Sequence, residues 1–283
     1  MFVESGYIAI GVSFALSIYI SLAALTGGIK KIPELIVSAR WGLYTLPILL
    51  FVAVAALVNA FVTNDFSVRY VAENSNLAMP QQYTWVALYA GNAGSLLFIA
   101  IVFSLLAVIG ILSIRKSLPH STPYALTLMA LVLTFFLGII CFMANPLERL
   151  PITPADGQGI NPLLVHFGMF IHPPVQMTGL VSVTIPFSIA IGAMLAKRGG
   201  RDEWVDIGRI WGMISWLILT MGLLLGSWWA YTILGWGGYW AWDPVENSAL
   251  MPWLAMTAFI HSIMVQKRRG MFRMWNMVII IVA

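Results

Sequence analysis

Long apolar stretches separated by short polar segments recur along the whole chain. Seven of them approach the length of about 20 residues that a helix needs to cross the hydrocarbon core of a bilayer, and an eighth begins near residue 271. Because lipid offers no hydrogen-bond partners, each stretch must satisfy its backbone internally, which predicts helices. The pattern therefore predicts an all-α transmembrane bundle of seven or eight spans, at residues 7–26, 42–63, 93–114, 123–144, 173–196, 210–234 and 248–266.

The composition agrees with a bilayer as the surrounding medium. Hydrophobic residues make up 60% of the 283 positions and charged residues 9%, whereas soluble domains carry about a quarter charged residues. No soluble domain or repeat interrupts the pattern, so we predict a single membrane domain over residues 1–283. The last apolar run, residues 274–283, is too short to span, so we expect the chain to continue beyond residue 283 or to be completed by a separate subunit.

Several classes of function are disfavoured by the residues themselves. The single cysteine, Cys141, excludes an intrachain disulfide and a cysteine metal cluster, and we interpret it as a core residue. The net charge of +4 is spread over short loops, which argues against nucleic-acid binding. No nucleophile motif, phosphate-binding loop or carboxylate pair indicates hydrolysis or phosphoryl transfer.

Basic residues fall on one set of loops, which predicts the topology. With the N-terminus outside, the cytoplasmic loops hold 13 of the 15 basic residues, and only Arg69 and Arg149 fall outside. The N-terminal segment has no basic region before its first apolar run, so we interpret that run as a retained span and not as a cleaved signal. The cytoplasmic set is Lys30, Lys31, Arg40, Arg115, Lys116, Lys197, Arg198, Arg201, Arg209, Lys267, Arg268, Arg269 and Arg273.

A tryptophan-rich segment, residues 228–253, follows the sixth span and is expected to face outward. It holds six of the twelve tryptophans. Trp228 and Trp229 suit two interpretations, an interfacial anchor or part of a ligand surface. Trp236, Trp240 and Trp242 alternate with small residues that include Gly237 and Gly238, a spacing that offers flat aromatic faces to a planar ligand such as a porphyrin.

The end of this segment carries a helix-start pattern. Asp243 followed by Pro244 suits an N-cap and a first helical position. Asp243 and Glu246 can equally order the preceding loop or bind a partner, and the sequence leaves both interpretations open.

Four histidines are candidate iron ligands, since imidazole is the usual nitrogen ligand of haem. His261 lies in an apolar span, where an ionisable group is costly and usually functional. His172 precedes Pro173 and Pro174, which mark a helix start or a kink, so both a ligand and a structural role stay open. His120, in a turn among basic residues, is interpreted as a solvated loop residue, and His166 is a substitute ligand.

The run Trp236-Gly237-Gly238-Tyr239-Trp240-Ala241-Trp242-Asp243-Pro244 matches the WWD signature of the haem-handling membrane proteins that include CcmC, CcsA and CcmF. The continuation through Asn247, the run 251–254, and the His-Pro-Pro at 172–174 resemble the CcmF and NrfE type of cytochrome c haem lyase subunit. The resemblance extends over essentially the whole chain, as an N-terminal portion of such a protein. Residues 91–95, Gly-Asn-Ala-Gly-Ser, depart from it, because the family usually has His-Glu there.

The resemblance implies a role in cytochrome c maturation in the plasma (inner) membrane of a bacterium. The WWD segment would receive haem on the extracytoplasmic side, and His172 and His261 would ligate a b-type haem in the membrane as a pair. The implied partners are apocytochrome c, a haem chaperone of the CcmE type and a thiol-handling subunit of the CcmH type. Family members carry two outer histidines that flank the WWD loop, and no histidine follows His261 here, so a complete delivery site would need sequence beyond Ala283.

The resulting hypothesis is a haem lyase component. Its rivals are a haem transporter without ligation, for which the spans offer few polar groups, a quinol-linked membrane oxidoreductase that uses a b-type haem, and a purely structural assembly subunit.

Overall fold

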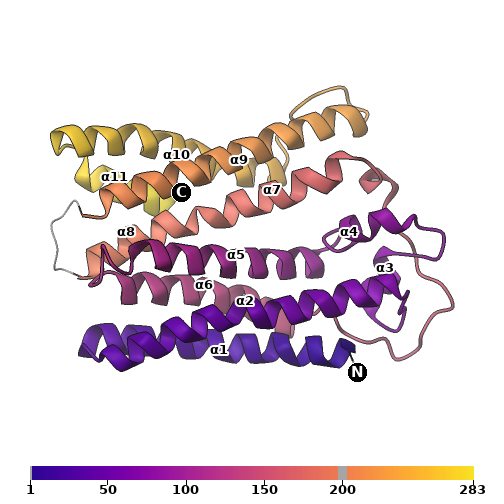
Figure 1. Cartoon of the computed structure of the whole chain (residues 1–283). Helices are drawn as coiled ribbons and strands as arrows, with labels where there is room; N and C mark the ends of the chain where they lie inside the picture. The colour runs from indigo at the N-terminus through magenta and orange to yellow at the C-terminus, as the bar shows by residue number, and fades with distance from the viewer. Residues whose placement is uncertain (1, 197–202) are drawn as a thin grey trace.

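The computed structural model describes residues 2–196 and 203–283 and is a bundle of long antiparallel helices (Figure 1). Seven helical spans in these ranges are long and apolar enough to cross a membrane, which confirms the all-α transmembrane class. They are α1 (Phe2–Lys30), α2 (Pro33–Val62), α5 (Asn92–Ile114), α6 (Thr122–Phe142), α7 and α8 together (Gly168–Ser182 and Thr184–Ala196), α9 (Val205–Ile233) and α10 (Pro244–Arg269).

Short elements complete the described part of the chain. The helix α11 (Arg273–Val282) folds back along α10, and four short elements lie in the connections: α3 (Arg69–Asn74), η1 (Gln81–Tyr83), α4 (Thr84–Ala87) and η2 (Pro162–Leu164). One isolated antiparallel bridge, between Val68 and Arg149, is the β pairing found within the described ranges.

Each predicted span overlaps one of these helices, but most helices are longer than predicted. The apolar pattern marks only the part of a helix that lies in hydrocarbon, and the helix continues into polar surroundings at both ends. The second span begins nine residues earlier than expected, at Pro33, and the fifth, expected to begin at residue 173, begins at Gly168. The two prolines at 173 and 174 therefore lie inside the helix and do not mark its start.

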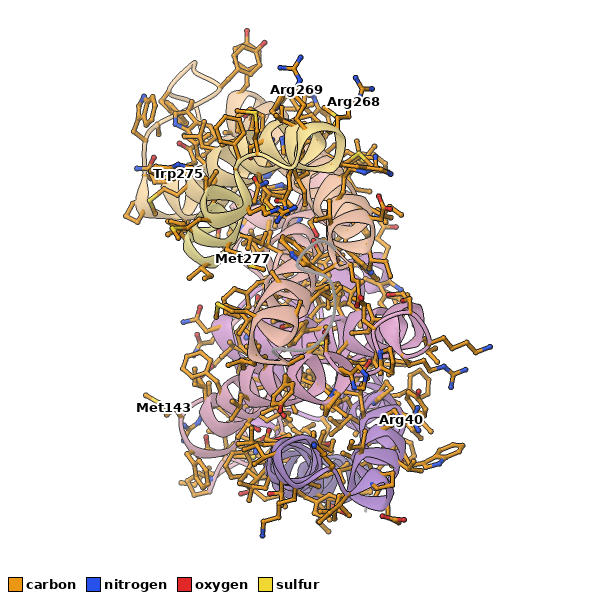
Figure 2. All side chains as sticks on the ribbon, turned by 90° about the vertical axis from the view of Figure 1, so that its left-hand side faces the viewer. Arg40, Met143, Arg268, Arg269, Trp275 and Met277 are labelled. Carbon is orange, nitrogen blue, oxygen red and sulfur yellow. The ribbon has the colours of Figure 1, made fainter. Side chains whose placement is uncertain are left out.

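The bundle has two chemically different ends. One, the loop end, carries the start of α1, helices α3 and α4, the segment 143–167 and the α9–α10 connection (Figure 1). The other, the basic end, faces the viewer in Figure 2, where Arg268 and Arg269 extend from α10 and Arg40 lies on α2. All ten described residues of the predicted cytoplasmic set lie toward the basic end, while Lys197, Arg198 and Arg201 lie outside the described residues.

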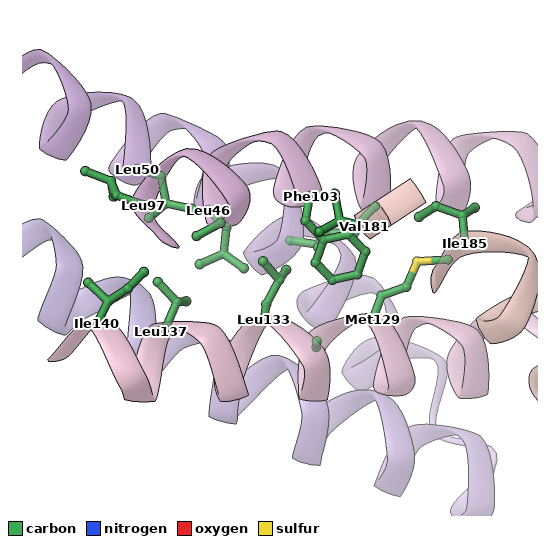
Figure 3. Close-up of a cluster of buried hydrophobic side chains, with 14 of the residues drawn as sticks. Leu46, Leu50, Leu97, Phe103, Met129, Leu133, Leu137, Ile140, Val181 and Ile185 are labelled. Carbon is green, nitrogen blue, oxygen red and sulfur yellow. The ribbon is translucent and has the colours of Figure 1, made fainter. Parts of the chain in front are cut away.

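The core runs along the bundle axis between α2, α5 and α6. Leu46 and Leu50 of α2 face Phe103 of α5 and Leu133 of α6, and all four side chains are fully buried (Figure 3). Helix α7 then packs on α9, and α9 packs on α10, so the last helices form a second group beside the first. Because α8 packs on α6 and α7 packs on α5, the span formed by α7 and α8 joins the two groups, and the position of α7 sets the position of everything it carries at the loop end.

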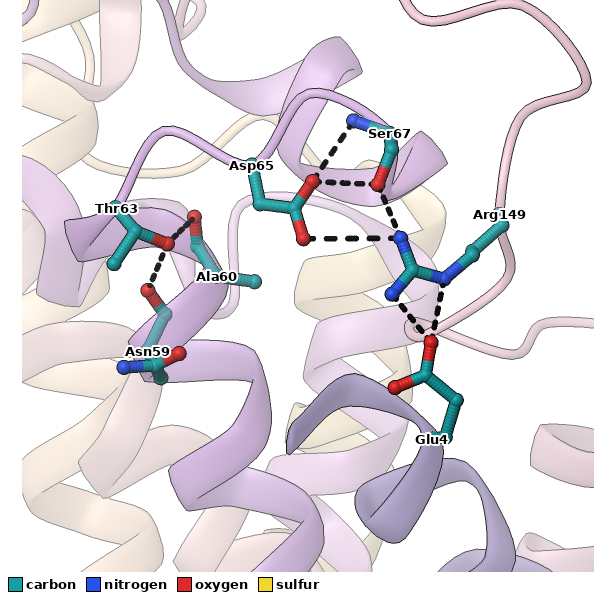
Figure 4. Close-up of polar contacts among 7 residues, drawn as sticks. All are labelled: Glu4, Asn59, Ala60, Thr63, Asp65, Ser67 and Arg149. Atoms are coloured by element: carbon teal, nitrogen blue, oxygen red, sulfur yellow. Dashed lines mark hydrogen bonds and ion pairs between the residues drawn. The ribbon is translucent and has the colours of Figure 1, made fainter. Parts of the chain in front are cut away.

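The two basic residues at the loop end are both held in ion pairs. Arg149 donates from Nε and Nη2 to one carboxylate oxygen of Glu4, at 3.0 and 2.5 Å, and its Nη1 contacts Ser67 and Asp65 (Figure 4). Arg69 pairs with Glu148 at 3.1 Å. These contacts fasten the segment after α6 to the start of α1 and to the α2–α3 connection, which gives both arginines a structural role away from the other basic residues.

Candidate functional site

The α9–α10 connection, residues 234–243, is the tryptophan loop, and its backbone is irregular. Gly235 and Gly237 have φ values of +65° and +73°, which glycine adopts without strain. Trp242 has φ +60°, an uncommon conformation for a bulky residue. Trp236 is 41% exposed and Trp242 is 68% exposed, so the indoles stand on the surface of the loop end and not in the core.

Carboxylates at the start of α10 hold this loop in place. Asp243 caps α10 by accepting the backbone N–H of Glu246 at 2.7 Å. Glu246 reaches back and accepts the N–H groups of Ala241 and Trp242 with the same oxygen, at 2.7 and 2.8 Å. The Asn247 amide donates to the carbonyl of Trp242 at 2.9 Å. Both interpretations of the acidic pair are thus found together, because one residue caps the helix and the other orders the loop.

Aromatic contacts arrange the loop's rings into two pairs. Trp240 and Trp242 meet edge to face at 5.9 Å, with an interplanar angle of 82°. Tyr239 stacks on Tyr231 of α9, with ring centroids 4.3 Å apart and planes within 8°. The indole N–H of Trp240 is buried without a hydrogen-bond partner in the described chain. The loop therefore presents exposed aromatic faces, which suit a large planar ligand.

His172 lies at the loop end of α7, against α9. Its Nδ1 is 3.1 Å from the carbonyl oxygen of Gly222, and its ring stacks near Trp229 with centroids 6.3 Å apart. A β-carbon on Gly226 would lie 2.6 Å from the imidazole, so glycine is required there for the ring to fit. His166 makes a similar contact with Trp228, at 5.3 Å between ring centroids. Trp228 and Trp229 thus each pack against a histidine.

Tyr89 explains why α7 continues through its two prolines. Pro173 lacks the N–H that would bond the carbonyl four residues earlier, which belongs to Met169. The hydroxyl of Tyr89 donates to that carbonyl instead, at 2.9 Å. Burial raises the pKa of Tyr89 to about 12, so the hydroxyl keeps its proton and remains a donor. His172 therefore sits in an intact helix one turn from the start of the span.

We expect Tyr89→Phe to lower the free energy of unfolding by about 1–3 kcal/mol, since it leaves a buried carbonyl without a donor. Thermal unfolding of the detergent-solubilised protein, followed by near-UV circular dichroism, measures this. Tyr83→Phe is the matched control, because Tyr83 also packs on α7 but its hydroxyl bonds nothing in the described chain. Equal losses in the two variants would contradict the role of the Tyr89 hydroxyl.

The hydrogen bonds of three histidines show which ring nitrogen carries the proton in each. A carbonyl oxygen only accepts, so Nδ1 carries the proton in His172 and also in His261, whose Nδ1 is 2.8 Å from the carbonyl of Thr257. Nε2 then keeps its lone pair, which is the arrangement of a metal-binding histidine. In His166 the situation is reversed, because Nδ1 accepts the N–H of Gly168 at 3.0 Å. In His172 and His261 the unprotonated nitrogen is therefore Nε2, whereas in His166 it is Nδ1.

The structure does not bring His172 and His261 together. Bonds from Trp216 to Thr257 and from Trp253 to Thr220, at 2.8 and 2.7 Å, fix the register of α10 on α9. His261, one turn beyond Thr257, therefore lies at the level of residue 212 of α9, whereas His172 lies at residues 222–226. At 1.5 Å per residue this is a difference in depth of roughly 15–20 Å.

This separation corrects the expected pairing. One iron requires its two ligand nitrogens within about 4 Å, two metal–nitrogen bonds of about 2 Å each. In addition, His172 is partly enclosed by α7 and α9, while His261 is exposed on the side of α10. Two histidines at these places do not ligate one haem between them, so each would need a different second ligand.

Two residues near His172, Gln176 and Tyr89, were not predicted from the sequence. Gln176 lies one turn after His172 on the face of α7 that meets Gly222; it is only 9% exposed, and neither atom of its amide has a partner in the described chain. A buried amide without partners is unfavourable by about 1–3 kcal/mol per group. The position of Gln176, one helical turn after a candidate ligand, could have been recognised from the sequence. The Tyr89 contact could not, because it joins residues 80 positions apart.

Comparisons with known proteins give matches over most or all of the chain. The family model described as Cytochrome C assembly protein matches residues 85–283. A cytochrome c-type biogenesis protein CcmF from Haemophilus influenzae is 39% identical over the whole chain, and NrfE from the same organism is 35% identical over 98% of it. The solved structure of a cytochrome c haem lyase CcmF covers the whole chain with a TM-score of 0.88 and 31% identity.

The chain spans less than half the length of the relatives it matches: 44% of that CcmF, 43% of NrfE and 45% of the solved lyase. Within this portion, the family model covers the tryptophan loop and all four histidines, His120, His166, His172 and His261. The fold and the sequence agree over the full set of spans. The chain is therefore a multi-pass membrane protein that belongs to the cytochrome c assembly protein family.

Proposed function

We propose that this chain is the haem-handling portion of a cytochrome c haem lyase, in which the tryptophan loop and His172 hold the haem that is being delivered. The observation that supports this most strongly is the loop itself: exposed indoles on a backbone tied down by Glu246, at the same end of the bundle as an imidazole whose Nε2 is free. A loose loop would have to be ordered by its ligand, whereas this one is ordered beforehand.

The basic end supports the proposed orientation. Basic residues concentrate on the cytoplasmic side of membrane proteins, so the loop end would face outward. The N-terminus and the tryptophan loop then lie on the extracytoplasmic side of the plasma membrane. That side is where an apocytochrome with a Cys-x-x-Cys-His motif would be met, and where a carrier of the CcmE type would bring haem. A subunit of the CcmH type would keep the cysteines reduced.

In this proposal the residues of the chain bind and orient the haem substrate. The indoles of Trp236 and Trp242 cover one face of the macrocycle, and His172 offers Nε2 to its iron while the carbonyl of Gly222 holds the ring in the right tautomer. The vinyl groups are left open to the thiols of the apocytochrome. Each thiol then adds across a vinyl double bond to form a thioether, which needs no oxidant.

His261 fits a separate role deeper in the bundle. Its Nε2 is free, its Nδ1–H is held by Thr257, and its ring is exposed on the side of α10. It would help to hold a b-type haem in the membrane, together with a ligand from outside the described residues. Such a haem would supply electron transfer when bound. The residues of this chain would fix its position, since Trp216 and Trp253 lock α10 on α9.

The proposal is tested by following covalent haem attachment to a reporter c-type cytochrome in cells. His172→Ala is expected to lower attachment at least a hundredfold, because an iron ligand is lost. His166→Ala is the matched control, since it lies six residues earlier at the same end but holds the wrong tautomer, and it is expected to change attachment severalfold at most. Normal attachment in His172→Ala would exclude the proposed site.

A further inference from the structure

A groove of about 400 Å³ lies at the basic end, outside the site described above. It opens between the α1–α2 turn and the α5–α6 turn, and the end of α8 closes one side. Its walls are of two kinds. Lys31 and His120 provide polar groups, while Ile29, Ile36 and Ala196 provide apolar surface. Neither the tryptophan loop nor the candidate iron ligands take part in it.

Positive charge dominates the rim. Lys30 and Lys31 belong to the first turn, Arg115 and Lys116 to the second, and none of these four has an ion pair within residues 2–196 and 203–283. Glu34 is the acidic residue of these two turns; it is exposed on α2 and does not line the groove. Of these cations Lys31 lines the groove, which therefore offers an anion one cation without an ion pair in the described ranges.

One helix N-terminus adds to this field. Helix α2 begins at Pro33 beside the groove, and its N-cap, Ile32, makes no side-chain hydrogen bond. The start of α6 does not contribute, because it is buried and its Thr122 N–H already donates to the carbonyl of Leu118. The first amides of an uncapped helix carry partial positive charge and bind anions. Elsewhere in the bundle α10 has its own carboxylate cap, Asp243, so its first amides are already occupied.

We propose that this groove binds the phosphodiester headgroup of an anionic glycerophospholipid from the leaflet at the basic end. The anion would lie between Lys31, His120 and the start of α2. The apolar walls would accept the first part of an acyl chain, which a free phosphate lacks. A lipid also reaches this level of the bundle by diffusion in the membrane, since the helices end at the interface.

The test reconstitutes the chain in phosphatidylcholine nanodiscs that contain spin-labelled phosphatidylglycerol, and measures the motionally restricted fraction of the label. Lys31→Gln is expected to weaken retention about fivefold, the effect of one cation at an anionic surface. Ala196→Phe fills the groove without changing charge and is expected to abolish the restricted fraction. Arg269→Gln, at the same end but away from the groove, is the matched control and should leave it within about twofold.

Three outcomes would contradict the proposal. Equal weakening by Arg269→Gln and Lys31→Gln would mean that only the diffuse charge of the basic end attracts the lipid, and would overturn the proposal. Unchanged retention in Ala196→Phe, with the variant's melting temperature at the wild-type value, would also overturn it. Displacement of the labelled lipid by inorganic phosphate alone would show that the groove is a site for a free anion and not for a lipid.

Discussion

Replacing Trp236, Trp240 and Trp242 together by alanine is expected to lower covalent haem attachment roughly a hundredfold. Each indole that stacks on a flat ring contributes about 1 kcal/mol, and three of them about 3 kcal/mol. The effect should appear as weaker capture of haem, because the backbone bonds from Ala241 and Trp242 to Glu246 do not involve the indoles. A reporter c-type cytochrome, stained for covalent haem, gives the measurement.

Trp85→Ala is the matched control for that variant. Its indole is 59% exposed at the same end of the bundle, but it lies on α4, away from the tryptophan loop. Attachment in Trp85→Ala should remain at the wild-type level. If the triple variant attached haem normally, or if Trp85→Ala lost as much, the loop's indoles would not be the haem-handling surface.

Glu246→Ala is the second change with a large expected effect. It removes the acceptor of two backbone N–H groups, at 2.7 and 2.8 Å, and leaves Trp242, in its left-handed conformation, with its bond from the Asn247 amide. A charged hydrogen bond is worth about 1.5–3 kcal/mol. We expect the loop to lose its fixed arrangement and attachment to fall about thirtyfold, with proteolysis between residues 234 and 243 as an independent measure of disorder.

Two further variants distinguish the effect of ordering the loop from the effect of capping α10. Glu246→Gln keeps a carbonyl oxygen in the same place and should restore most of the attachment. Asp243→Asn keeps the cap and should change little. Loss in Asp243→Asn equal to that in Glu246→Ala would mean that the start of the helix matters and the bonds to the loop do not.

The sequence predicted the spans because a bilayer imposes one simple requirement, an apolar run of sufficient length. It predicted the helix start at Pro244 for a similarly local reason, since a cap is written in adjacent residues. The start of the fifth span was wrong because the prolines at 173 and 174 normally end or begin a helix. The bond from Tyr89 that lets α7 continue comes from a distant segment, and no local pattern contains it.

The predicted pairing of His172 with His261 on one iron is not found in the structure, for a related reason. Both are candidate ligands by residue type, and in each the unprotonated nitrogen is Nε2. Whether two ligands share a depth depends on the register of three helices, which is set by contacts such as Trp253 to Thr220 and by the close approach of α7 to Gly226. Register of this kind is a property of tertiary packing and is not encoded in the spacing of either histidine.

The most direct measurement is the optical and resonance Raman spectrum of haem in the purified wild-type protein, in His172→Ala and in His261→Ala. Iron bound through different ligands gives separable bands. If His172 holds the delivered haem at the loop end and His261 holds a second haem in the membrane, each substitution should remove one haem signal and leave the other. Loss of the same single signal in both variants would show that the two histidines share one iron, and full retention in both would show that neither is a ligand.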